Sequence, residues 1–109
     1  MTTTPEDRVR IVELFEELGC AQLRDASATR TNVLAPGLRR IAGTRLAGPA
    51  FPVATDNDML PCLQALAAAP PGSVLVLHNT ALESEALAGD ILVSAARAQG
   101  LAGLVVDGA

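Results

Sequence analysis

The sequence contains no lysine, no tryptophan and no tyrosine, and it has one histidine and two cysteines. Without a lysine amine, these residues cannot form the imine on which Schiff-base and pyridoxal enzymes depend. Cys20 and Cys62 lie far apart in the chain, with no CxxC pair and no neighbouring histidine, which argues against a zinc site or a Cys–His nucleophile. We therefore expect both cysteines to be reduced, buried and hydrophobic in role.

Basic residues are also scarce. The eight basic residues, all arginine, are scattered along the chain, and the net charge is −4 with a pI near 4.7. A nucleic-acid interface needs a basic patch or stripe, so nucleic acid is not an expected partner. The chain has neither a long apolar run nor a signal-peptide pattern, and we predict a cytoplasmic protein that does not bind membranes.

What the sequence has in quantity is small aliphatic side chains. Half of its 109 residues are hydrophobic, and only two of these are phenylalanine. This length supports one domain, whose core must consist of many small contacts between helices and a sheet. The pattern of elements below predicts the α/β class.

The first half of the chain is predicted to be mainly helical. Thr4 and Pro5 are typical of a helix start, and an apolar stripe at helical spacing continues to Gly19. A short second helix is expected at 23–31. Residues 41–54 have the composition of a strand that is broken or bulged near Gly48 and Pro49.

The second half reads as alternating helices and strands. In "TDND", Asp56, Asn57 or Asp58 is expected to cap a helix. The buried face of that helix is predicted to consist of Leu60, Leu63, Leu66 and Ala67. "SVLVLH" (73–78) is typical of a strand covered on both faces, as in a parallel sheet. A helix at about 90–99, a Gly100 cap and a strand at 101–107 complete a β-loop-α-β unit.

The segment Gly89-Asp90-Ile91-Leu92 is the main candidate site. Ligands of open α/β sheets bind at the start of helices that follow strands, where free amides and the helix dipole attract anions. A small carboxylate would fit there. The alternative is that Asp90 is an ordinary helix cap. As a ligand-binding residue, Asp90 would repel an anion unless a cation or a water separated them.

The other acidic residues have simpler explanations. "TDND" lacks the spaced ligands of an EF-hand loop, which favours capping over a calcium or magnesium site. Glu83 and Glu85 are expected to be solvated. Asp107, at the end of the last strand, either lies near the site or caps the next turn.

Several segments, taken in order, resemble the RraA-like family. They are Asp25-Ala26, "RLAGPAFPV" (45–53), Asp56-Asn57, "PPGSVLVL" (70–77), Gly89 to Leu92 and "AQGLAGLVVDGA" (98–109). The resemblance extends from about residue 19 to the last residue. The family includes 4-hydroxy-4-methyl-2-oxoglutarate aldolases with oxaloacetate decarboxylase activity, and the regulator of ribonuclease E activity.

The resemblance implies a swivelling β/α/β-type domain with a mixed sheet flanked by helices. Residues 1–109 would form part of such a domain, with a helical N-terminus at 4–31 and an α/β core at 41–109, ending before its C-terminal strands. The implied assembly is a homotrimer or a higher homo-oligomer. The implied activity is that of a class II lyase, dependent on Mg²⁺ or Mn²⁺, which converts small 2-oxo acids to pyruvate.

The resemblance also assigns roles to residues. Gly89, Asp90, Ile91 and Leu92 match the substrate-binding helix start, where Asp90 would act in catalysis by orienting a water. The family's arginine and its metal-ligating aspartate would follow beyond Ala109, so no metal ligand is expected in this chain, and we expect the 109 residues alone to be inactive. His78 stands where the family often has an acidic residue. The alternative function is a non-catalytic regulatory module that binds a protein.

Overall fold

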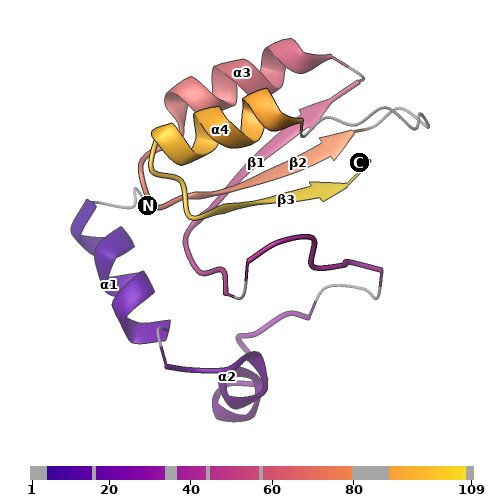
Figure 1. Ribbon diagram of the computed structural model, residues 1–109. Helices are drawn as coiled ribbons and strands as arrows, with labels where there is room; N and C mark the ends of the chain where they lie inside the picture. The colour runs from indigo at the N-terminus through magenta and orange to yellow at the C-terminus, as the bar shows by residue number, and fades with distance from the viewer. Residues whose placement is uncertain are drawn as a thin grey trace.

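The computed structural model describes residues 5–15, 17–33, 37–43, 45–56, 58–79 and 89–107. Helices and strands alternate in its second half, which confirms the predicted α/β class (Figure 1). The elements, in chain order, are α1 (Pro5–Phe15), α2 (Cys20–Ala26), β1 (Ala50–Thr55), α3 (Met59–Ala68), β2 (Val74–Asn79), α4 (Asp90–Ala98) and β3 (Gly103–Asp107).

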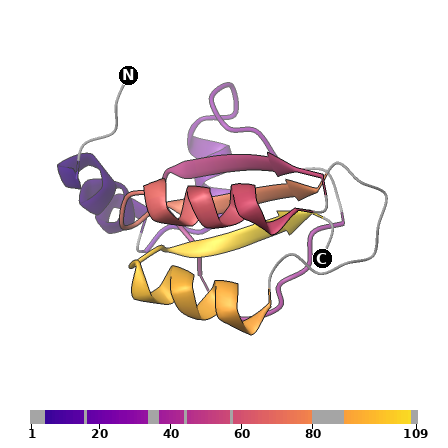
Figure 2. The same cartoon turned by 90° about the horizontal axis from the view of Figure 1, so that it is seen from above.

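The three described strands form a parallel sheet in the order β1-β2-β3. Ala50 pairs with Val74, and Val74 in turn pairs with Gly103. Parallel neighbours need a crossover, and α3 and α4 provide the two crossovers. Both helices cover the same face of the sheet, as Figures 1 and 2 show from two directions. All three strands therefore end at one edge, which we call the carboxyl edge.

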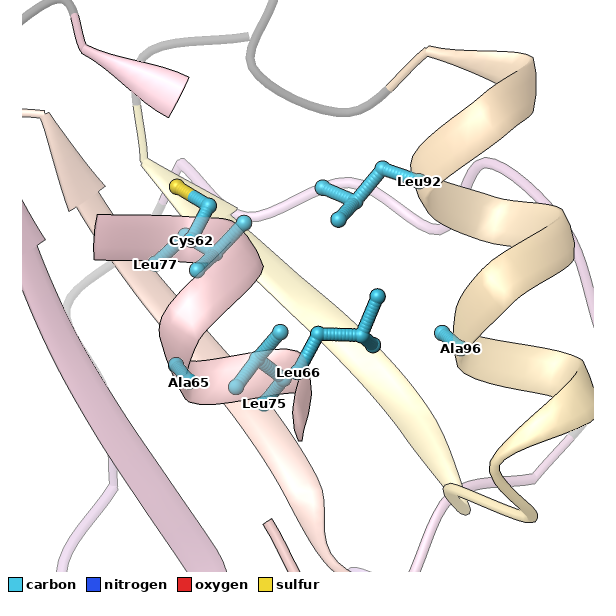
Figure 3. Close-up of a cluster of buried hydrophobic side chains, with 7 residues drawn as sticks. All are labelled: Cys62, Ala65, Leu66, Leu75, Leu77, Leu92 and Ala96. Carbon is cyan, nitrogen blue, oxygen red and sulfur yellow. The ribbon is translucent and has the colours of Figure 1, made fainter. Parts of the chain in front are cut away.

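The core lies between the sheet and these two helices. Leu75 and Leu77 of β2 have no exposed surface, and Leu92 of α4 is 2% exposed. Figure 3 shows these side chains together with Cys62, Ala65, Leu66 and Ala96, which complete the buried cluster. Since β2 is the central strand and carries the continuous apolar run, its burial confirms the strand expected at 73–78.

The predicted buried face of α3 is wrong in part. Leu66 is buried as expected, but Leu60 and Leu63 are 56% and 47% exposed, and Ala67 is exposed. The buried positions are instead Cys62, Ala65, Leu66 and Ala69, which share one face at helical spacing. Three of these four side chains are small, which lets the helix backbone approach the sheet closely.

The N-terminal helices are shorter than predicted. The first ends at Phe15 rather than at Gly19, which instead precedes the next helix as its N-cap. The Gly19 amide donates to Oε1 of Gln22 over 2.8 Å, which supports the start of α2. That helix spans Cys20–Ala26, not 23–31. The Arg45 guanidinium donates to the carbonyl oxygens of Phe15 and Leu18 and so ties the end of α1 to the chain before β1.

The strand expected at 41–54 begins only at Ala50. The reason lies in Gly48 and Pro49, where the break was predicted. A Cβ atom on Gly48 would lie 2.3 Å from the carbonyl oxygen of Gly72, so the two backbones meet there without room for a side chain. Pro49 has no amide hydrogen to donate, but its carbonyl accepts from Val74 at 2.8 Å.

Candidate functional site

The carboxyl edge of the sheet is the place where a ligand would bind in a fold of this class. Thr55, Asn79 and Asp107 are the last residues of β1, β2 and β3. Helix α4 begins after β2, so its N-terminus belongs to the crossover that leaves this edge. Two features of the edge carry chemistry: the start of α4, and a pair of polar side chains at the ends of β2 and β3.

The first turn of α4 is capped by a residue without a side chain. Gly89 is the N-cap, with φ −96° and ψ −179°, and its carbonyl accepts from the Val93 amide at 3.0 Å. The preceding amides, of Asp90, Ile91 and Leu92, are first-turn donors without an intrahelical acceptor. Gly89 offers no side-chain oxygen, and among the described residues no side chain caps this turn. Free first-turn amides and the positive end of a helix dipole attract anions.

The backbone and the side chains of the four predicted substrate-binding residues, Gly89 to Leu92, have to be considered separately. The backbone of all four forms the helix start, as expected. The Leu92 side chain, however, is part of the core with Leu77 (Figure 3), so this residue can contribute only its amide. The side chains of Asp90 and Ile91 are outside the described residues, so the predicted role of Asp90 stays a prediction. Glu83 and Glu85 also lie outside the described part.

Helix α3 gives a direct comparison, because its first turn is capped by its own side chain. Asp58 is the N-cap and its Oδ1 accepts from the Leu60 amide at 3.0 Å. The Asp58 amide in turn donates to Oγ1 of the buried Thr55 over 3.2 Å. The "TDND" segment therefore caps a helix, as predicted, and the amide of Leu60 is already used.

The second feature is a contact between His78 and Asp107. The Nδ1 atom of His78 lies 2.7 Å from Oδ2 of Asp107, and the two residues are direct partners in the register of β2 and β3. The side chains are 56% and 72% exposed. Because Leu77 and Val106 pack against the helix-covered core, the next residues along each strand point to the opposite face.

Sequence reasoning missed this pair, although a signal was present. His78 and Asp107 each follow directly after an apolar run that was predicted to be a strand. In parallel neighbours, residues at equivalent strand ends lie side by side. What the sequence did not supply was the relative register of the two runs, which decides whether Asp107 meets His78 or a neighbour.

The described residues do not fit a metal centre. In the described ranges, no group of three or more His, Cys, Asp or Glu side chains could hold an ion.

The two cysteines differ in exposure, and neither belongs to such a group. Cys62 is buried, as expected, and Cys20 is exposed, which corrects the prediction for that residue; both are free thiols. Burial, and secondarily the negative charge of Asp58, raise the pKa of the Cys62 thiol, which disfavours the reactive thiolate.

Comparison with known proteins gives one family and one relative. The RraA-like family model, described as Aldolase/RraA, matches residues 20–109. A protein of Halalkalibacterium halodurans named "Putative 4-hydroxy-4-methyl-2-oxoglutarate aldolase" is 30% identical over 102 residues, which cover 93% of this chain and 49% of that protein. The chain thus spans about half the length of the curated relative it matches. No solved structure matches it. Within the described residues, no helix has the length and apolar character needed to cross a membrane.

Proposed function

The chain belongs to the RraA-like family, and from this premise we propose that its protein is a carbon–carbon lyase that converts small 2-oxo acids to pyruvate. The candidate reactions are cleavage of 4-hydroxy-4-methyl-2-oxoglutarate and decarboxylation of oxaloacetate. The name of the relative supports an aldolase. The observation that carries the proposal is the start of α4 at the carboxyl edge, where the N-cap is a glycine without a side-chain cap hydrogen bond.

The role proposed for these amides is to bind the carboxylate of the 2-oxo acid. They offer several N–H donors and a positive partial charge to one small anion. Gly89 lets the anion approach the backbone, since no atom of the described residues lies within 4 Å of where its Cβ would be. We propose that Asp90 orients a water for proton transfer.

Cleavage next to a 2-oxo group leaves the enolate of pyruvate, which needs an imine or a cation to stabilise its charge. These 109 residues contain no lysine to form the imine, and we propose a class II reaction dependent on Mg²⁺ or Mn²⁺. The described residues do not fit such an ion. The role proposed for them is therefore to bind the substrate and to move its protons.

The remaining parts of the proposal concern the whole protein. We propose a cytoplasmic homotrimer or higher homo-oligomer. Because this chain spans about half of its relative and its described residues do not fit a metal centre, we expect the 109-residue polypeptide alone to show no turnover. Metal-dependent release of pyruvate by this polypeptide would contradict that expectation.

The test is pyruvate formation from oxaloacetate by the longest natural polypeptide that contains this chain. We expect turnover that a chelator abolishes and that Asp90→Ala lowers about 100-fold, the effect of losing a positioned proton-transfer group. Gln64→Ala, an exposed position within α3, is the matched control and should keep full activity. Unchanged turnover in Asp90→Ala would remove Asp90 from the mechanism. No turnover by the wild type would favour the regulatory, protein-binding alternative.

A further inference from the structure

We propose that His78, held through Nδ1 by Asp107, is the group that exchanges a proton with the bound 2-oxo acid through Nε2. This inference rests on the proposed lyase function and adds to it a residue that the family resemblance does not assign. It has three supports: the contact itself, its place at the carboxyl edge, and the chemistry that the contact imposes on the imidazole ring.

The contact determines which ring nitrogen carries the hydrogen. An ionised carboxylate only accepts hydrogen bonds, so with Oδ2 of Asp107 at 2.7 Å the Nδ1 atom of His78 is the donor. In the neutral ring, Nε2 then carries a lone pair and is a base.

The position of the pair makes this base accessible. Both residues lie at the strand ends where ligands of such sheets bind, and their direct register holds them together on the face opposite the helices. An acid whose carboxylate binds the start of α4 would therefore meet Nε2 across the end of β2. More than half of the His78 side chain is exposed. The charged group that the structure places against it is Asp107 on β3, whereas its partner on β1, Ala54, carries no charge. Among the described residues, Asp107 is the carboxylate in contact with His78, and it is engaged with Nδ1.

An exposed ion pair contributes little to stability. A pair that served only stability could lie anywhere on the protein surface. Here the pair joins the only histidine of the sequence to the last residue of the neighbouring strand. Histidine is the side chain that most readily gains and loses a proton near neutral pH. Its placement at the ligand-binding edge therefore fits proton transfer better than stabilisation.

The proposed step balances without a further reactant. In aldol cleavage, Nε2 removes the proton of the substrate's 4-hydroxyl group. The bond between C3 and C4 breaks, C4 becomes a carbonyl, and the electron pair of the bond forms the enolate of pyruvate. The imidazolium then returns its proton to C3, which yields pyruvate and restores neutral His78. Decarboxylation uses only the second proton transfer, and His78 regains its proton from water.

The first test uses the 109-residue chain and needs no turnover. Because the sequence has one histidine, nitrogen NMR of the imidazole ring reports on His78 alone. We expect the hydrogen of the neutral ring on Nδ1 in the wild type, with loss of this preference in Asp107→Ala. Pyruvate, added with magnesium chloride, should shift the Nε2 signal saturably, and acetate should have a smaller effect. A neutral ring with its hydrogen on Nε2 would overturn the proposal.

The same titration distinguishes the substrate-binding role of the α4 start from the proton-transfer role of His78. If pyruvate shifts the amide signals of Asp90 to Leu92 but leaves His78 unchanged, the α4 site stands and the role of His78 is wrong. If neither responds, the proposed substrate-binding role of the α4 start fails together with this inference. A shift at both places supports both.

The second test uses the longer natural polypeptide. We expect His78→Gln to lower kcat about 100-fold with little change in KM, and to flatten the dependence of kcat on pH. Asp107→Asn, which keeps the shape but not the charge, should give an intermediate kcat. Gln64→Ala is the control. Pyruvate release with the wild-type kcat and pH profile in His78→Gln would refute the role of His78 while leaving the lyase function in place.

Discussion

The Nδ1 atom of His78 lies 2.7 Å from Oδ2 of Asp107, and this contact joins the ends of two neighbouring parallel strands. Both side chains are more than half exposed, so water weakens the attraction between them. We expect Asp107→Ala to lower the free energy of unfolding by at most about 1 kcal/mol, as for other exposed ion pairs. Urea denaturation at neutral pH measures this. A loss of several kcal/mol would show that the pair serves the fold rather than a ligand.

The close approach at Gly48 gives a prediction about stability. A Cβ atom there would lie 2.3 Å from the Gly72 carbonyl oxygen, which is backbone and cannot rotate away. We expect Gly48→Ala to destabilise the protein by about 1–3 kcal/mol, as for other overpacked sites. Gly89→Ala is the matched control, since a Cβ at that position meets no atom of the described residues within 4 Å. Equal melting temperatures of the two variants would contradict the observed packing.

The core of the sheet gives a second pair of variants. Leu77 has no exposed surface, whereas Leu63, a leucine predicted to be buried, is 47% exposed. We expect Leu77→Ala to cost about 2–5 kcal/mol and Leu63→Ala much less, because only the first leaves a cavity. The comparison, made by urea denaturation, also tests which face of α3 contacts the sheet. A larger loss for Leu63→Ala would mean that the predicted face was correct after all.

The buried thiol of Cys62 gives a prediction about pH. Burial, and then Asp58, raise the pKa of this thiol above its ordinary value of 9.0. Above pH 9 the unfolded chain loses this proton while the folded chain keeps it, so stability should fall as the pH rises. The chain has no lysine or tyrosine to mask the effect. Urea denaturation in a Cys20→Ser background should show this fall, and Cys62→Ala should reduce it. Stability that rises between pH 8 and 10 would contradict the direction of the shift.

The sequence predicted most of the α/β core because local rules decide it. The continuous apolar run forms β2, Asp58 caps α3, and Gly100 adopts a positive φ of 75° after α4. Each of these depends on neighbouring residues only. The errors concern long-range packing: the face of α3 and the start of β1 depend on contacts with distant segments, such as that between Gly48 and Gly72.

The two features of the candidate site also differ in whether local sequence determines them. The start of α4 was predictable, since a glycine before a helical pattern marks it locally. The contact between His78 and Asp107 was not, because it depends on the register between β2 and β3. Register depends on the hydrophobic pattern and on the geometry of the connection, and the pattern of single segments does not specify the geometry of the long connection between β2 and β3.

The most direct test of the account is the binding of pyruvate to the start of α4. Amide proton–nitrogen spectra of the 109-residue chain, recorded during a pyruvate titration with magnesium chloride, should show saturable shifts at Asp90, Ile91 and Leu92. The Leu60 amide is an internal control, since the carboxylate of Asp58 already occupies it. Gly89→Ala should weaken the response without unfolding the chain. Shifts at the start of α3 equal to those at the start of α4, or none at either helix, would contradict the account.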